Sequence, residues 1–470
     1  MFGEYPAIKI VAELEQHNLL PAILFRTSRK QCDIDIEKLS GARDLELNAE
    51  RSKALVLEVE KVVEKYSFEE SVVYNHPHYK ALLHCGAGAH HAGQLLIWRL
   101  LLEELMSRGV MRLMVATGTV AAGVDFPARS VIITAHSKRG AEGFNVLSAA
   151  ELQQMSGRAG RRGKDAVGFC LVAPSRFADA RVVLEVSRRQ VEPLTSAYFA
   201  APSTVLNLLK FRNVDDLKYT VSKSLAAFLD RKHAAGMRAE AERMQDEVLS
   251  SQKQSVEQKK KSEKRVRRRQ READALEGRQ ERYLSSALNG LEKLGHLEGA
   301  SLSAKGYWAA ELCTSLVLEL AEAIDGGLFY DLSHLELIGL VGSISGDSYR
   351  RYFSLSANPI RSELFAELSE HVARVKNTYE RIAPFEVEVV PDAALTVITW
   401  AQSESWEEFS SLLRLGGVAE GDVARLVTQA ADHLNQISKL HATHTELART
   451  ASEARRLLLK PPLSEAYLNE

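Results

Sequence analysis

A glycine-rich segment with two arginines constrains this chain most strongly. Residues 154–163 read Gln-Met-Ser-Gly-Arg-Ala-Gly-Arg-Arg-Gly, which places Arg158 and Arg161 one helical turn apart among glycines. Arginine forks neutralise the charge that spreads over a γ-phosphoryl group during transfer, and glycines let a phosphate approach the backbone closely. A solvated helix surface is the alternative interpretation for this segment alone, because short motifs also occur by chance.

A second segment supports the phosphate interpretation. Residues 116–128 follow an apolar run and read Ala-Thr-Gly-Thr-Val-Ala-Ala-Gly-Val-Asp-Phe-Pro-Ala, with small residues such as Gly123 and one carboxylate, Asp125. A carboxylate in such a loop can accept a hydrogen bond from a ribose hydroxyl. The two segments occur in this order, each beside a predicted strand, and together they favour a nucleotide site.

Residues 1–188 alternate predicted strands and helices, which is typical of an α/β fold with a doubly wound parallel sheet. A helix is predicted over residues 94–109, where apolar residues recur at helical spacing. Ligands of such sheets bind at the carboxyl ends of the strands. We therefore expect residues 116–128 to leave the end of a strand and residues 154–163 to open a helix nearby. The strands are predicted at residues 22–25, 80–84, 112–116, 130–134 and 167–172.

These segments resemble motifs V and VI of superfamily-two helicases, specifically the superkiller and exosome-associated branch of DExH-box RNA helicases. Residues 21–32 resemble motif IV, and residues 88–93 resemble the segment between motifs IV and V. Two positions depart from the family pattern. Gly118 stands where an acidic residue is usual, and Asp125 stands where asparagine is usual.

The resemblance implies that residues 1–188 form a second RecA-like helicase domain, which completes an ATP site and holds one nucleic-acid strand. Arg158 and Arg161 would act on the γ-phosphate. The other ATP-binding residues would be Gln154, Gly157, Gly123 and Asp125. The strand phosphates would be held by Ser28, Arg29, Thr117 and Thr119.

The resemblance extends over the rest of the chain. It implies a winged-helix domain over residues 189–310 and an all-α helical bundle over residues 311–470. A helix that begins near Glu420 would project Arg425 towards the strand, as a ratchet helix does in relatives. Candidate contacts further along this helix are Asn435 and Gln436. A solvated helix face is the alternative, and we expect Trp400 and Trp406 in the bundle core.

A charged tract, residues 231–283, interrupts the predicted winged helix. It has no proline and few apolar residues, and it contains the basic runs 259–261 and 265–269. Helix-forming residues predict one or two protruding, solvated helices, whereas the absence of sustained apolar heptads disfavours a stable coiled coil. An RNA-touching arm and a flexible solvated linker both remain open.

Composition sets outer limits. The 470 residues are 45% apolar, which suffices for two to four domains with proper cores. The four scattered cysteines show no metal-binding spacing, so we expect a reducing, cytoplasmic location and no structural metal. No apolar run approaches membrane-spanning length. The formal net charge of −2 does not itself indicate nucleic-acid binding.

The sequence contains no G-x-x-x-x-G-K-[ST] phosphate-binding loop. We therefore expect ATP and Mg²⁺ to be bound mainly by a first RecA-like domain upstream, and this chain to be inactive alone. The implied function is that of the C-terminal part of an ATP-dependent RNA helicase, with single-stranded RNA and a possible nuclease as partners. Two alternatives remain, a DNA-repair helicase or translocase and a non-enzymatic RNA-binding scaffold.

Overall fold

A five-stranded parallel sheet organises the first part of the chain in a computed structural model that describes residues 5–121, 128–140, 143–250, 256–353, 359–379 and 387–464. The strand order is β2-β3-β1-β4-β7. The bounds are β1 Ala22–Phe25, β2 Ala87–His90, β3 Leu113–Ala116, β4 Ser130–Ile133 and β7 Phe169–Val172. The α/β fold class predicted from the alternating pattern is thus confirmed.

Helices cover both faces of this sheet because successive strand residues point to opposite sides. In β1, Ala22 and Leu24 pack into a core with α1, α2 and α5, whereas Ile23 and Phe25 pack into the larger core on the other face. The helices of the first face are α1 Ala7–Gln16, α2 Arg29–Ser40 and α5 Tyr79–Cys85. Those that contribute to the larger core are α3 Ala49–Tyr66, α4 Glu70–Tyr74, α6 Leu96–Ser107, α7 Ala149–Ser156 and α8 Ala180–Ser187.

Four of the five strand predictions and the helix at 94–109 are confirmed, but the strand at 80–84 is wrong. Those residues belong to α5, and the strand β2 follows them. A short apolar run does not distinguish a strand from a buried helix, and β2 reads Ala-Gly-Ala-His with no β-branched residue. Packing against α6 requires a glycine at position 88, because an added Cβ would lie 2.7 Å from the Leu102 side chain.

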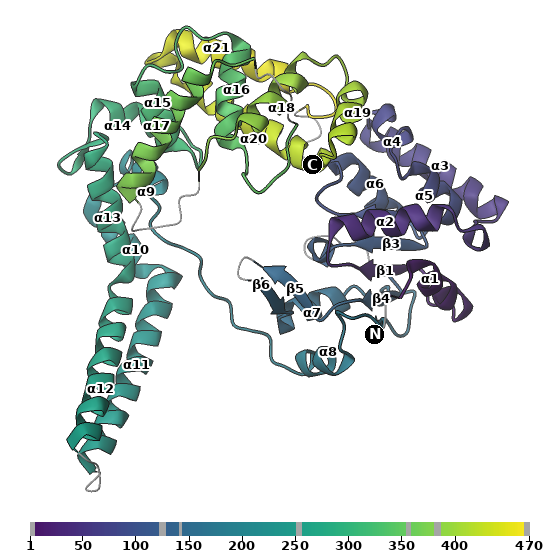
Figure 1. Cartoon of the computed structure of the whole chain (residues 1–470), viewed down its shortest axis with the longest axis horizontal. Coiled ribbons are helices and arrows are strands. Elements are labelled where there is room, and N and C mark those ends of the chain that lie inside the picture. The colour runs from purple at the N-terminus through teal and green to yellow at the C-terminus, as the bar shows by residue number, and fades with distance from the viewer. Residues whose placement is uncertain are drawn as a thin grey trace.

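Short elements complete the α/β domain and lead into the next region. The hairpin of β5 Ser137–Gly140 and β6 Gly143–Val146 stands beside the main sheet, and Figure 1 shows it next to α7. Residues 190–201 form no helix or strand and connect α8 to α9. Among the residues that the structure describes, three 3-10 helices occur, η1 Arg43–Leu45, η2 Gly118–Ala121 and η3 Lys439–Ala442.

The region predicted as a winged helix contains several helices and one short hairpin. Its elements are α9 Pro202–Leu209, α10 Val214–Lys223, α13 Arg279–Lys293, β8 Leu297–Glu298, β9 Ser301–Leu302 and α14 Ala304–Ala309. The strands β8 and β9 pair antiparallel, with Leu297 opposite Leu302. The domain boundaries at residues 188 and 310 stay predictions.

The charged tract forms a helical arm, as predicted. It consists of α11 Leu225–Ser250 and α12 Val256–Glu277, which pack along each other and extend away from the rest of the molecule (Figure 1). The packed residues are small and recur at seven-residue spacing, namely Ala234 and Ala241 on α11, and Val266 and Ala273 on α12. The absence of sustained apolar heptads was a poor argument against close packing of two helices, because alanine lets two helices pack closely without a strong apolar pattern.

The remaining helices form a bundle. Its members are α15 Val317–Asp325, α16 His334–Ser345, α17 Ser362–Tyr379, α18 Pro391–Gln402, α19 Trp406–Gly416, α20 Glu420–Ser438 and α21 Thr445–Leu458. Trp400 and Trp406 are buried with their ring centroids 5.2 Å apart, so their predicted place in the core is confirmed. None of the helices in the described ranges is long and apolar enough to cross a membrane.

Candidate functional site

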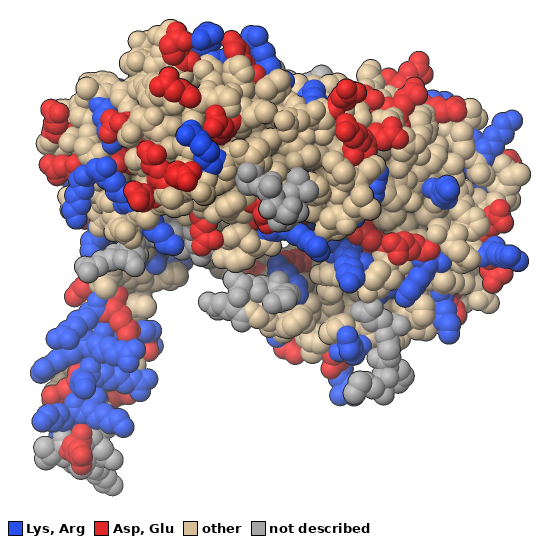
Figure 2. All heavy atoms as spheres, turned by 45° about the horizontal axis from the view of Figure 1, so that its top comes forward, with Lys and Arg blue, Asp and Glu red and all other residues tan. Residues whose placement is uncertain are grey.

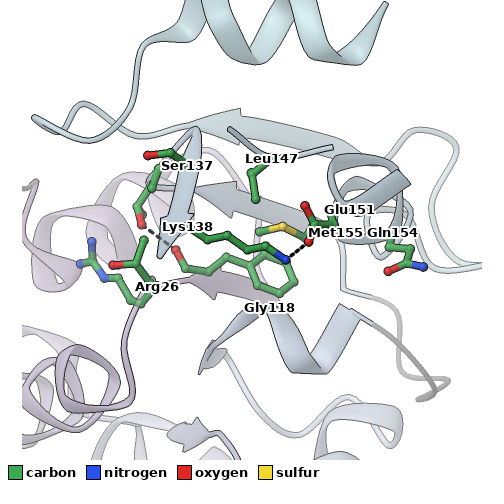
Figure 3. Close-up of a pocket in the computed structure, with 12 residues that line it drawn as sticks. Arg26, Gly118, Ser137, Lys138, Leu147, Glu151, Gln154 and Met155 are labelled. Atoms are coloured by element: carbon green, nitrogen blue, oxygen red, sulfur yellow. Dashed lines mark hydrogen bonds and ion pairs between the residues drawn. The ribbon is translucent and has the colours of Figure 1, made fainter. Parts of the chain in front are cut away.

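A pocket of about 370 Å³ lies at the carboxyl edge of the main sheet (Figure 3). Thr27, Gly118 and Thr134 line it where β1, β3 and β4 end, and Gln154 lines it from α7. The wall is held by local bonds, since the Thr134 hydroxyl donates to the Phe25 carbonyl at 2.6 Å. The other lining residues include Arg26, which is buried and paired with Asp35 at 2.6 Å, and the ion-paired Lys138 and Glu151.

The helix α7 positions Gln154 and the two arginines. It begins at a capping box in which Ser148 and Glu151 exchange side-chain and backbone hydrogen bonds, and it ends at Gly157. Arg158 and Arg161 therefore lie in the turn after a helix, and our expectation that residues 154–163 open a helix is wrong. The capping box lies upstream of the glycines and fixes where the helix starts.

The arginine turn also lies at a different edge of the sheet than we expected. The Ala128 N–H donates to the Arg158 carbonyl at 2.9 Å, and the Gly160 N–H donates to the Ala128 carbonyl at 2.7 Å. Ala128 precedes β4, so these bonds hold the turn at the amino end of that strand, and Gly168, which precedes β7, lies against the same turn. A Cβ on Gly168 would lie 2.4 Å from the Ala159 carbonyl carbon. Close backbone crossing thus explains part of the glycine pattern that we attributed to phosphate approach.

Asp165 fixes the guanidinium of Arg161. The Arg161 Nε and Nη2 donate to its two carboxylate oxygens at 2.8 and 2.9 Å, and the Arg161 backbone N–H donates at 3.0 Å. The Asp165 side chain is 1% exposed and also lies 3.4 Å from Arg129. Hydrogen bonds from Arg161 lower the pKa of Asp165 to about 2. We did not single out Asp165 from the sequence, although an acid four residues after an arginine is the available signal.

The predicted ATP-binding residues are distributed over this region. Gln154 projects from α7 at the carboxyl-edge pocket, away from the Lys138–Glu151 pair (Figure 3). Gly157 caps α7, and its N–H donates to the Gln153 carbonyl at 2.8 Å. Gly123 and Asp125 lie outside the described residues. The structure therefore places Gln154 and the arginines on one segment, but at opposite edges of the sheet.

The predicted strand contacts gather at the carboxyl edge. Ser28 caps α2, its hydroxyl accepting from the Gln31 N–H at 3.2 Å. Thr117 follows β3, which pairs with β1, so Thr117 and Ser28 follow neighbouring strand ends. Arg29 pairs with Asp422 of α20 at 2.8 Å. The backbone of Thr119 belongs to η2, and its side chain lies outside the described part of the structure.

Helix α20 docks directly on this edge. The Gly421 N–H donates to the Gly93 carbonyl at 3.0 Å, and an added Cβ on Gly421 would lie 2.4 Å from the Ala92 carbonyl oxygen. Only a glycine fits this contact without a shift. A groove of about 300 Å³ lies between the start of α6 and α20, and Arg99 and Arg425 line it.

The structure separates the three predicted contacts on α20. The Arg425 side chain is 50% exposed and lies 3.5 Å from Asp347. Gln436 is buried, and its side-chain oxygen accepts from the Cys313 N–H at 3.2 Å and from Lys439 at 3.0 Å. Gln436 is therefore a bundle residue, and its prediction as a strand contact is wrong. Asn435 is half-buried beside it.

The histidines of residues 88–93 make structural contacts. His90 lies 2.6 Å from Glu103, and His91 lies 2.9 Å from Asp33. Within the described ranges, no group of three or more His, Cys, Asp or Glu side chains is arranged to hold a metal ion.

The site thus consists of a parallel α/β domain with an arginine turn and a helical bundle that docks on the carboxyl edge of its sheet. Residues 299–466 match the family described as the DSHCT (NUC185) domain. The chain is 36% identical over 196 residues to the chloroplastic DExH-box ATP-dependent RNA helicase DExH15 of Arabidopsis thaliana, covering 42% of this chain and 16% of that protein.

Two further relatives agree. The chain is 32% identical over 227 residues to the mouse exosome RNA helicase MTR4, covering 48% of this chain and 21% of the relative. It is 31% identical over 229 residues to the human superkiller complex protein 2, and this match covers 48% of this chain and 18% of that protein. These matches span about a fifth of the relatives' own length. Together with the domain match, they show that the chain is similar, over less than half of its length in each case, to DExH-box RNA helicases that include exosome and superkiller proteins.

Proposed function

We propose that this chain is the nucleotide-closing and strand-holding part of an ATP-dependent RNA helicase that translocates on single-stranded RNA and unwinds duplexes. The observation that carries the proposal is the docking of α20 on the carboxyl edge of the sheet. It brings Ser28, Arg29 and Thr117 onto one surface with the groove that contains Arg425. Such a surface can follow a nucleic-acid backbone from one domain to the next.

The nucleotide half of the proposal rests on the arginine turn. ATP would be bound mainly by a first RecA-like domain with a phosphate-binding loop, which would also hold Mg²⁺. Arg158 and Arg161 would neutralise charge on the γ-phosphate, and Gln154, Gly157, Gly123 and Asp125 would help to place the nucleotide. Asp165 leaves the Arg161 Nη1 atom without a partner among the described residues, so one donor of a pre-oriented guanidinium remains for a phosphate.

The proposed strand-holding role predicts that RNA is bound independently of its base sequence. Ser28, Arg29, Thr117 and Thr119 would hold phosphates, and Arg425 would hinder backsliding. Phosphate contacts dominate such a site, so the affinity should fall steeply with salt. Asp422 and Asp347 lie 2.8–3.5 Å from three arginines, Arg29, Arg350 and Arg425, so the cations of this cluster outnumber its acids. The edge therefore keeps a positive balance for a phosphate despite the ion pairs.

The ATPase test uses this chain alone and the assembly of the chain with a RecA-like domain that carries a phosphate-binding loop. The chain alone should hydrolyse no ATP, and the assembly should hydrolyse it. Arg161→Ala should lower the rate in the assembly by about 10³- to 10⁵-fold while sparing RNA binding. Arg162→Ala is the matched control, because Arg162 is the exposed neighbour of Arg161.

ATP hydrolysis by the chain alone, with contaminating ATPases excluded, would contradict the proposal that a first RecA-like domain supplies most of the ATP site. Equal losses from Arg161→Ala and Arg162→Ala would contradict the role of Arg161. An assembly without ATPase activity that still binds RNA would favour the scaffold alternative. Titration of matched single-stranded RNA and DNA at fixed salt decides between an RNA helicase and a DNA-repair translocase. A nuclease partner and a cytoplasmic location stay predictions.

A further inference from the structure

A row of basic residues runs along the outer side of the arm helix α12. Lys260, Lys264, Arg267 and Arg271 are all exposed, and Figure 2 shows Lys and Arg crowded along the arm. The α-helical repeat of 3.6 residues puts these four positions on one side of the helix. Val266 and Ala273, which face α11, lie on the other side. We refer to these four residues as the arm stripe.

The four residues of the arm stripe keep their charge, whereas several other cations of the arm are neutralised by ion pairs. Arg238 pairs with Asp274 at 2.9 Å and with Glu277, Arg268 pairs with Glu272 at 2.8 Å, Arg269 pairs with Glu240 at 2.6 Å, and Arg279 pairs with Asp230. None of the four stripe residues forms an ion pair with another residue that the structure describes. The arm thus uses acids to close its helices together and leaves one face positive.

The geometry of the stripe is that of a straight, rigid row. The four cations occupy successive turns, about 5.4 Å apart, and span about 16 Å along the helix axis. The buried seam of the arm and the ion pair of Arg269 with Glu240 at 2.6 Å hold the two helices together. Such a row matches a partner whose negative charges are themselves regularly spaced.

The composition of the arm further restricts the partner. Residues 231–282 contain no Phe, Tyr or Trp. Proteins that hold unpaired bases normally provide aromatic side chains on which the bases stack, so the stripe offers nothing to a single strand beyond charge. Double-helical RNA presents its phosphates in fixed positions and is recognised through shape and backbone. A rigid cationic row without stacking residues fits the duplex better than the single strand.

We propose that the arm stripe binds the phosphate backbone of double-helical RNA. This deepens the proposed helicase function, on which it rests for its biological setting, by naming a second RNA-binding surface. The edge of the sheet and α20 hold the single strand, and the arm holds a paired region of the same substrate. The arm would contribute no sequence preference, because all four contacts are to phosphates.

The test compares the full chain with a variant in which Lys260, Lys264, Arg267 and Arg271 are all replaced by Gln. The probes are a blunt RNA duplex of about 20 base pairs and an unstructured single-stranded RNA of matched length. Loss of four phosphate contacts should reduce the slope of log affinity against log salt for the duplex by about 3 to 4. Single-strand affinity should stay within about twofold, since the groove at α20 is untouched.

A matched control replaces four exposed lysines elsewhere by Gln, at Lys9, Lys53, Lys80 and Lys376, so that the net charge changes equally. Circular dichroism and thermal melting should show both variants folded, because exposed substitutions change stability by about 0.5 kcal/mol or less. An unchanged duplex affinity and salt slope in the stripe variant would overturn the proposal and leave the stripe a solvated face. Equal losses for duplex and single strand would overturn the assignment to double-helical RNA. The binding assay needs no ATP hydrolysis, so absence of ATPase activity would refute the helicase proposal without affecting this one.

Discussion

The contact of Gly421 with the α/β domain yields a sharp prediction. An added Cβ would lie 2.4 Å from the Ala92 carbonyl oxygen and 2.5 Å from that of Gln94. Neither atom belongs to a flexible side chain, so Gly421→Ala must displace the start of α20 by several tenths of an ångström. Overpacking of this kind costs about 1–3 kcal/mol. Alanine is favoured over glycine by about 1 kcal/mol within a helix, and we therefore expect a net loss of up to about 2 kcal/mol in the free energy of unfolding.

Urea unfolding of the chain measures this effect, and Gly236→Ala in α11 is the matched control. Gly236 is also helical, but a Cβ there would meet nothing within 4 Å. The control should gain up to about 1 kcal/mol from helix propensity. Gly421→Ala should also weaken binding of single-stranded RNA, whereas Gly236→Ala should not. If both variants gain stability and bind RNA normally, α20 does not dock as closely as these distances require, and the surface that supports the proposed function is wrong.

Burial raises the pKa of the Glu319 carboxyl in α15 from 4.5 to about 7, so its ionisation increasingly penalises the folded state as the pH rises over that interval. Glu319→Gln should therefore raise the free energy of unfolding by about 3 kcal/mol at about pH 8, and by little at about pH 4. Urea titrations at the two pH values measure this difference. An equal gain in stability at both pH values would contradict the burial argument. Asp165→Asn should lower kcat of the assembled ATPase by about 100-fold with RNA affinity kept, because Arg161 loses its orientation; an unchanged kcat would show that Asp165 does not position it. Arg425→Ala should slow strand separation while basal ATP hydrolysis persists and stability changes by about 0.5 kcal/mol or less. A variant that unwinds normally, or melts several degrees lower, would make Arg425 a structural residue.

The elements that the sequence predicts well are those whose apolar residues are bulky. The run Ala-Ile-Leu-Phe makes β1 over the predicted residues 22–25, because both faces of this central strand are buried. The run at 80–84, Lys-Ala-Leu-Leu-His, was also predicted as a strand but belongs to α5, and the neighbouring β2 reads Ala-Gly-Ala-His. Which of two adjacent segments enters the sheet depends on α6, whose Leu102 leaves room only for Gly88. That information lies in tertiary packing and not in the local pattern.

In the candidate site, too, the sequence indicates the types of residue but not their tertiary contacts. A motif can indicate Arg161 and Arg29 because each type of residue suits a phosphate. It cannot indicate that Arg29 pairs with Asp422, which is 393 positions away in the sequence. It also misleads about the glycines near Arg161, since Gly168 is required by a backbone crossing. Gln436 failed as a strand contact for a related reason, because helical spacing predicts a face of α20 but not which neighbours cover it.

The contacts provide a continuous route between the two predicted sites. The arginine turn is bonded to Ala128 at the start of β4, and β4 pairs with β1, which pairs with β3. The strand β3 pairs in turn with β2, and the turn after β2 bears Gly93, whose carbonyl accepts from Gly421 of α20. Every step is a backbone hydrogen bond within or beside a sheet that is buried on both faces. These bonds link the arginines proposed to contact the γ-phosphate to the start of α20, the helix proposed to hold the strand. In the proposed helicase, sliding of α20 against its own α/β domain would break the Gly421–Gly93 bond, so we expect a ratchet action of α20 to come from movement relative to a first RecA-like domain.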